Sequence, residues 1–323
     1  QKEDLIDPEA QDWLYQGDAE KWLKLAYGLK ARYTMHLLKR SANKDADMEK
    51  VLEYVNNSFE SAEEQAAFDV YDANNINPLY GFFVARAGLG ASESMRSKLA
   101  EYNDPRLSRA FITKQGTSEK EQAPGTADNA VYAPNGTPEQ GTSKYGTSLF
   151  MYSISAPTLL LSYHELKFLE AEALCRLERD AKSALKDAVV AGLLNAENSF
   201  TISRKKLGKT LINAASSITE AEAESYFDNT IEAKYTAEPL KTTMTQKYFA
   251  LWGASGEATE SYNDVRRMKG LGENFIELKN PNSFPLRCPY GNSDTTTNAE
   301  VKAAYGNGQY VYSENVWWAG GSR

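Results

Sequence analysis

Carboxylates and aromatic rings are interleaved in the segment SYHELKFLEAEALCR at 162–176. Its chemistry-bearing residues are Tyr163, Glu165, Phe168, Glu170 and Glu172. Two carboxylates beside aromatic side chains are the groups with which glycoside hydrolases cleave sugars, so a helical glycosidase is one possible interpretation. The chain has 44 Asp and Glu residues, and their separations are set by the tertiary structure. The sequence therefore nominates no catalytic residue.

The sequence offers few residues for histidine-based catalysis or for a metal site. The chain holds two histidines, His36 and His164, which leaves few ways to build a histidine-based triad. His164 and Glu165 do not begin a zinc motif, because the second His of that motif is missing. The oxygen ligands around Asp72 and at Asp294 lack the spacing of a calcium loop and its closing Glu. We expect no metal and no cofactor.

Residues suited to ligand binding are more abundant, because the chain contains 19 Tyr and 5 Trp. A sugar ring or an extended chain needs flat amphipathic faces edged by amides and hydroxyls. Loops provide such surfaces more often than packed helices do. We therefore predict that the ligand contacts are among the loop residues Tyr71, Asn74, Asn75, Tyr80, Phe82, Phe83, Tyr132 and Tyr145.

Two helix hairpins are predicted to carry these loops. At 162–194 apolar residues recur with helical spacing in two segments, and Asp180 stands where the second helix needs an N-cap. At 18–57 Asp18 and Asp47 are placed to cap two further helices. Each hairpin has roughly the size of a tetratricopeptide unit, about 34 residues.

The rest of the chain alternates loop-rich and helical stretches. The segments 68–90 and 110–155 are rich in Asn, Gly, Thr and Pro and predict loops with short extended pieces. Helices are predicted over 219–268, opened by a capping box of Thr219 and Glu222, and an irregular tail over 270–323. The predicted fold is mainly α, with hairpins on one side and a loop-rich half with few short strands on the other.

The overall composition limits the partners. A net charge of −8 argues against nucleic acid and against an anionic membrane surface, since both attract clustered positive charge. No run of 18 apolar residues is present, so no span of a membrane is predicted. Cys175 and Cys288 have neither the number nor the spacing of a disulfide framework or a metal site.

Six pieces of the sequence together resemble the SusD/RagB family, the surface nutrient-binding lipoproteins of Bacteroidetes. They occur in the order of the family: DWLYQGDAEKWLKLAYGLKARY at 12–33, SYHELKFLEAEALCR at 162–176, TQKYFALWG at 245–253, ESYNDVRRMKG at 260–270, FPLRCPYGNSD at 284–294 and VWW at 316–318. The resemblance covers nearly the whole chain. It implies one SusD-like domain over 1–323 that lacks the N-terminal part of the family, including its lipidated cysteine.

The resemblance implies a binding protein rather than an enzyme. Such a protein captures an oligosaccharide or, alternatively, a peptide at the extracellular face of the outer membrane. It passes this ligand to a SusC-like TonB-dependent transporter. It would sit on this transporter as a hinged lid, held through the helix hairpins. Only the lipid anchor, which is absent from this sequence, would touch the membrane. The 163–172 glutamates would cap or solvate the edge of a scaffold helix. Arg266 and Arg267 would be structural anchors that hold Asp264 or chain carbonyls near the tail. A cytoplasmic tetratricopeptide scaffold is a further alternative.

Overall fold

The computed structural model confirms a mainly α-helical protein. It describes residues 11–72, 74–86, 89–114, 122–124, 131–136, 145–208, 211, 215–253, 256–280, 282–316 and 321. These residues form two compact units, 1–277 and 278–323. No helix in these described ranges is long and apolar enough to cross a membrane.

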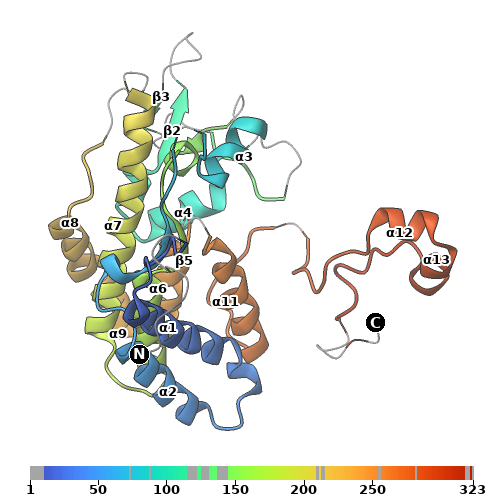
Figure 1. Cartoon of the computed structure of the whole chain (residues 1–323), viewed down its shortest axis with the longest axis horizontal. Coiled ribbons are helices and arrows are strands. Elements are labelled where there is room, and N and C mark those ends of the chain that lie inside the picture. Colours follow the sequence, from blue (N-terminus) through green and yellow to red (C-terminus); the bar gives the residue numbers. More distant parts are fainter. Residues whose placement is uncertain are drawn as a thin grey trace. The chain divides into compact units, whose positions relative to one another are not determined.

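The hairpin predicted at 162–194 is present as α6 (Tyr163–Arg176) and α7 (Lys182–Leu207), which pack along each other (Figure 1). Ser162 caps α6 by accepting a hydrogen bond from the Glu165 backbone N–H. Asp180 accepts one from the Lys182 N–H, although the residue at the N-cap position of α7 is Ala181. The second helix continues 13 residues beyond the predicted end at Leu194. Its last turns pack Phe200 and Ser203 beneath η3 (Leu149–Tyr152), so tertiary contacts prolong it.

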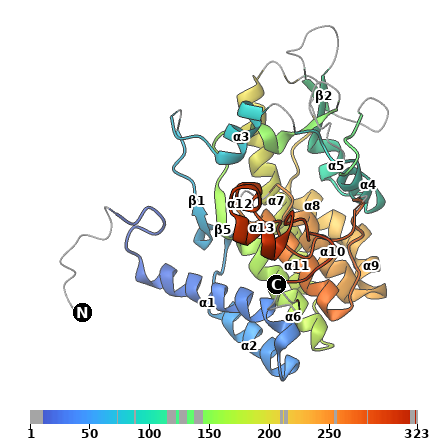
Figure 2. The same cartoon turned by 90° about the vertical axis from the view of Figure 1, so that its right-hand side faces the viewer.

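The N-terminal hairpin is also confirmed and consists of α1 (Ala19–His36), a short η1 (Leu38–Arg40) and α2 (Lys44–Asn56). Asp18 caps α1 as predicted. The predicted N-cap of α2, Asp47, is wrong. Asn43 is the N-cap, and Asp47 lies inside the first turn of the helix. Both helices pack against α6, and Figure 2 shows them side by side. Apolar residues of α1, α2, β5 and α6 form one continuous core there.

Two small sheets are formed by the described residues. β1 (Ala66–Phe68) pairs antiparallel with β5 (Thr158–Leu161), with Phe68 opposite Thr158. β2 (Phe111–Lys114) lies between β3 (Gln122–Pro124) and β4 (Thr147–Ser148). Much of the polar stretch between β2 and β4 falls outside the described residues.

Helices interrupt the predicted loop segments. The prediction of a loop over 68–90 is wrong for α3 (Pro78–Arg86), and η2 (Ala62–Glu64) precedes β1. Asn77 caps α3 by accepting from the Leu79 N–H, and its own amide donates to the Ala156 carbonyl. The hydrogen bond from Asn77 to Ala156 fixes the start of α3. The local pattern of Asn, Pro and Gly does not predict this helix, because Ala156 is distant in the sequence. α4 (Glu93–Glu101) and α5 (Arg106–Arg109) follow.

The helices predicted over 219–268 are confirmed as α8 (Glu220–Tyr226), η5 (Phe227–Ile231, a π-helical turn), α9 (Glu232–Ala237), α10 (Pro239–Ala250) and α11 (Ala258–Leu271). Thr219 and Glu222 make the capping box. α10 packs against both α6 and α7, and α11 against α1.

The unit 278–323 is less irregular than predicted. It contains α12 (Asn292–Thr297) and α13 (Ala299–Tyr305), capped by Asn298. The rings of Tyr290 and Tyr305 stack at 4.3 Å between centroids, and Arg287 lies over Tyr290. Val316 is described, but the two tryptophans of the closing VWW lie outside the described residues.

Candidate functional site

Three aromatic rings form an edge-to-face ladder beside the β1–β5 sheet. Trp13 contacts Phe68 and Phe68 contacts Tyr71, each pair with centroids 4.9 Å apart and planes at 70°. Trp13 is 50% exposed, and Phe68 and Tyr71 are half-buried. We call Trp13, Phe68 and Tyr71 the aromatic ladder. A ladder that is both rigid and half-exposed offers the flat faces that a sugar ring or peptide needs.

Both ends of the ladder are held by polar contacts. Asp12 accepts hydrogen bonds from the Trp22 indole (2.6 Å) and from the Leu14, Tyr15 and Gly17 backbone N–H groups. The bond from Trp22, followed by those from the backbone, lowers the pKa of Asp12 to about 2 despite some desolvation. At the other end the Tyr71 hydroxyl lies 2.5 Å from Thr158 Oγ1. The turn of Asp12 and strand β5 therefore fix the two outer rings.

An amide-bearing turn follows the ladder directly. Asp72 Oδ1 accepts from the backbone N–H groups of Asn74 (2.8 Å) and Asn75 (2.6 Å), and Asn75 Nδ2 donates to the Val70 carbonyl. The bonds from Asn75 and Asn74 lower the pKa of Asp72, so it is ionised and holds the turn at neutral pH. Both asparagines are exposed, three and four residues after Tyr71. Three of the predicted ligand residues, Tyr71, Asn74 and Asn75, therefore lie together.

The predicted residues of α3 face different ways. Phe83 is buried and packs edge-to-face on Tyr152 at 5.1 Å, so it belongs to the core and is not available to a ligand. Phe82 is 51% exposed, and half-buried Tyr80 has the Lys206 ammonium 5.7 Å from its ring centroid. The helical period, which the sequence did not reveal here, places the neighbouring rings of Phe82 and Phe83 on different faces of α3.

The last two predicted residues are part of the packing. Tyr132 is half-buried against Phe111, with Arg96 over its ring, and Tyr145 is buried. Tyr145 is thus out of reach of a surface ligand, which corrects its assignment to an exposed polar loop. Trp13 and Phe68 are not among the ligand residues predicted from the sequence, although Trp13 stands in the short DWLYQGD segment before α1.

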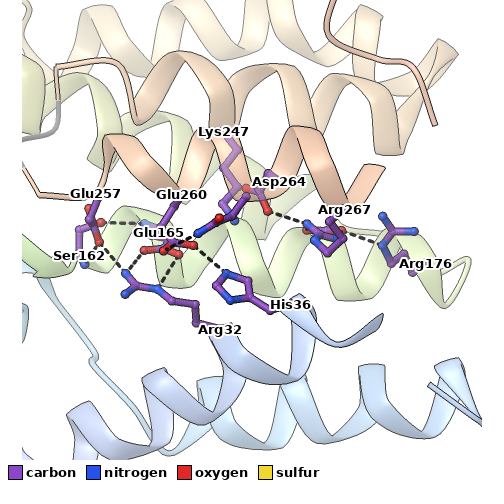
Figure 3. A network of polar contacts seen from close by, with 12 residues as sticks. Arg32, His36, Ser162, Glu165, Arg176, Lys247, Glu257, Glu260, Asp264 and Arg267 are labelled. Carbon is purple, nitrogen blue, oxygen red and sulfur yellow. Dashed lines mark hydrogen bonds and ion pairs between the residues drawn. The ribbon is translucent and has the colours of Figure 1, made fainter. Parts of the chain in front are cut away.

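A chain of buried charges joins α1, α6, α10 and α11 (Figure 3). Arg32 of α1 donates from Nε to Glu165 Oε1 (3.0 Å) and from Nη2 to Glu257 Oε1 (3.1 Å). The Ser162 N–H also donates to Glu257 Oε1 (2.6 Å), and His36 Nε2 lies 2.7 Å from Glu260. One face of α6 is therefore fastened to both α1 and α11 by charged groups.

The pKa values of Glu165 and Glu257 are shifted in opposite directions. Burial, and then the negative charge of Glu165, raise the pKa of Glu257 well above its ordinary value. Burial also disfavours ionised Glu165, but Arg32 and Lys247 outweigh it and lower its pKa. Arg32 donates to both carboxyls, from Nε to Glu165 and from Nη2 to Glu257, and so holds the two side chains together. Glycosidase carboxyls stand about 5–9.5 Å apart around a substrate, so this fully buried pair is a structural one.

A second group of charges continues along α6. Arg267 donates to both oxygens of Glu172 (2.5 and 2.8 Å) and to Asp264 (2.8 Å), and Arg176 donates to Glu172 (2.7 Å). Lys247 Nζ lies 2.8 Å from Asp264 Oδ2. These contacts confirm Arg267 as an anchor that holds Asp264.

Two expectations for these charged residues are corrected. Glu165 and Glu172 are fully buried ion-pair partners rather than solvated residues at a helix edge. Arg266 does not share the role of Arg267, since it is half-exposed and lies against Tyr262. Among the described residues no three His, Cys, Asp or Glu side chains are grouped to hold a metal ion.

Residues 2–290 match the SusD-like family whose description is "starch-binding associating with outer membrane". The chain belongs to the SusD/RagB family. A SusD/RagB protein of Bacteroides thetaiotaomicron is 66% identical over the whole of this chain, which spans 69% of its length, with a TM-score of 0.91. Among curated proteins none matches.

More distant SusD homologues show how far the fold extends. Two from Bacteroides fragilis are 20% and 17% identical, with TM-scores of 0.65 and 0.66. The matches cover 92% and 96% of this chain, and 67% and 70% of the length of the two homologues. At such identities the SusD-like likeness is one of fold. The predicted family and its mainly α fold are thereby confirmed, and the family is one of binding proteins associated with the outer membrane.

Proposed function

We propose that this protein captures a nutrient, most simply an oligosaccharide, on the aromatic ladder and the adjoining amide turn of Asn74 and Asn75. The observation that carries this proposal is the ladder itself, in which a half-exposed Trp13 packs on Phe68, and Phe68 packs on Tyr71. A ring already held in place loses little conformational entropy when a sugar stacks on it. The nearby amides supply donors and acceptors for hydroxyl groups.

Capture takes place at the extracellular face of the outer membrane, and the ligand passes to a SusC-like TonB-dependent transporter without a bond being made or broken. The family description, which associates its members with the outer membrane, supports this location. The hairpins α1–α2 and α6–α7 are the surfaces that we expect the transporter to grip, because stacked helix pairs present extended protein-binding faces.

Isothermal titration calorimetry against a panel of oligosaccharides and peptides tests the ligand class. We expect saturable heat with at least one α-glucan or other oligosaccharide, and unchanged glycans after long incubation. The Trp13→Ala variant should bind this glycan about three- to tenfold more weakly, since one aromatic contact contributes about 0.5–1.5 kcal/mol.

Tyr262→Ala is the matched control, because Tyr262 is a similarly exposed aromatic residue, on α11 (45% exposed). It should leave the affinity within a factor of two. Equal effects of the two variants would contradict the placement of the ligand on the ladder. Heat with peptides alone would move the ligand to the peptide class, and released sugar products would contradict a binding-only role.

A further inference from the structure

A pocket of about 450 Å³ opens between α7 and α8 and is closed on its other side by η2 and the start of α6. α7 and α8 lie side by side in both cartoons (Figures 1 and 2). The pocket shares no lining residue with the aromatic ladder or its amide turn. It is therefore a separate feature of the protein, and its role does not follow from the proposed function.

The floor of the pocket is apolar and comes from one face of α7. Val190, Ala191 and Leu194 lie within about one turn of each other and are half-buried. Asn195 and Asn198 stand beside this floor, and in the described part of the chain their side-chain amides have no hydrogen-bond partner. An apolar strip with free amides at its edge suits an aliphatic stem that ends in a polar group.

The rim of the pocket is strongly acidic. Its lining contains four carboxylates, from Glu60, Asp187, Glu220 and Glu224, and a single ammonium group, from Lys186. That ammonium group is bound by both oxygens of Asp228 at 2.8 and 2.9 Å, and its attraction to Glu224 is a weaker, longer-range one, so most of its charge is used outside the pocket.

Two of the carboxylates form ion pairs with lysines that do not line the pocket. Lys24 lies 2.9 Å from Glu60, and Lys167 lies 3.5 Å from Asp187. Glu220 and Glu224 differ, because among the described residues neither has an ion-pair partner, and both are exposed. They stand one turn apart on α8, so both side chains reach the same edge of the pocket.

We propose that this pocket binds a lysine- or arginine-bearing segment of a partner protein. The aliphatic stem of the basic residue lies on Val190, Ala191 and Leu194, and its cationic head lies between Glu220 and Glu224. A neutral sugar would leave both carboxylates unpaired, and an anionic ligand would be repelled by them. The charge of the rim thus selects a cationic occupant.

Fluorescence anisotropy with a labelled, end-capped seven-residue peptide of three lysines among Gly and Ser tests this proposal on the full chain in about 20 mM salt, where screening is weak. The same peptide with every lysine acetylated is the second probe. We expect the lysine peptide to bind and the acetylated peptide to bind at least fivefold more weakly.

The variant Glu220→Gln with Glu224→Gln should weaken the lysine peptide about three- to tenfold, since exposed ion pairs are individually modest. Its matched control is Glu93→Gln with Glu101→Gln on α4, where Glu93 occupies the first helical position as Glu220 does on α8. Both double variants change the net charge equally.

The control should alter binding by less than twofold. Equal weakening by both double variants would show attraction to the bulk charge alone and overturn the proposal. So would an absence of binding, or equal affinity for the acetylated peptide. Because glycan binding is measured separately on Trp13, either proposal can fail without the other.

Discussion

Arg267 is the residue on which the buried charges near the end of α6 depend most. Its guanidinium donates to Glu172 and Asp264, and all three side chains are at most 7% exposed. Burial disfavours the charged form of Glu172, but Arg267 and Arg176 outweigh it and hold its pKa far below the ordinary value. Without Arg267 the carboxylates would keep their desolvation cost and lose their strongest partner.

We predict that Arg267→Ala lowers the free energy of unfolding by about 3–5 kcal/mol, the usual cost of breaking a buried ion pair from one side. Urea unfolding followed by circular dichroism measures this change. The adjacent Arg266→Ala is the matched control and should cost less than about 1 kcal/mol, because Arg266 is half-exposed on Tyr262. Similar losses for both variants would contradict the role assigned to Arg267.

The close packing of α7 on α10 depends on a glycine at their contact. A Cβ atom built on Gly192 would lie 2.9 Å from the Cβ atom of Ala250. That distance is shorter than van der Waals contact, so the two helices can approach this closely only because position 192 has no side chain. Gly81 in α3 is a contrasting helical glycine, since its nearest neighbour, the side chain of Ile76, would lie 3.5 Å away.

The two glycines should therefore respond in opposite directions to the same substitution. Gly192→Ala should lower the unfolding free energy by about 1–2 kcal/mol, because overpacking exceeds the gain in helix propensity. Gly81→Ala should raise it by about 0.5–1 kcal/mol, because only the gain in propensity applies. Thermal and urea unfolding of both variants tests this, and stabilisation by Gly192→Ala would show that α10 can move away.

For the whole molecule, the buried network sets how stability depends on pH. Burial lowers the pKa of His164 to about 4, so the native protein keeps it neutral while the unfolded chain takes up a proton below about 6.5. Glu172 and Glu165 have lowered pKa values and bind fewer protons when folded. These three groups all make stability fall as the pH drops, first through His164 and then through the carboxylates.

Glu257 acts in the opposite direction. Its folded pKa is raised by burial and by Glu165, so the stability that it contributes is complete below about pH 4.5 and is lost as the pH rises toward the folded pKa. Glu257→Gln keeps the shape of the side chain and has the charge of its protonated form. We predict that the variant gains stability over the wild type as the pH rises above 4.5, by up to about 1.4 kcal/mol per pH unit.

Urea unfolding of both proteins at pH 5, 6, 7 and 8 measures this difference. Glu260→Gln is the control of opposite sign. Burial disfavours ionised Glu260, but His36 and Arg32 outweigh it and lower its pKa, so that variant should be less stable than the wild type at pH 7 and approach it in acid. A difference between Glu257→Gln and wild type that does not change with pH would mean that Glu257 is ionised in the folded protein.

Features that depend on local order can be predicted from the sequence alone. The periodicity at 18–57 and 162–194 predicts the two hairpins, Asp18 and the pair Thr219–Glu222 predict helix starts, and six short segments predict the family. Each of these signals lies within a few residues of the feature that it specifies. Helix periodicity and capping act over that range, so one sequence is enough to find them.

Tertiary structure decided which side chains meet. Among the predicted ligand residues, Tyr71 joins Trp13 and Phe68, whereas Phe83 and Tyr145 are buried in the core. Glu165 and Glu172, which read as surface carboxylates in the sequence, are the most deeply buried acids of α6 because Arg32 and Arg267 reach them from other helices. Burial and charge pairing depend on residues about 100 positions apart in the chain, and no local pattern records such distances.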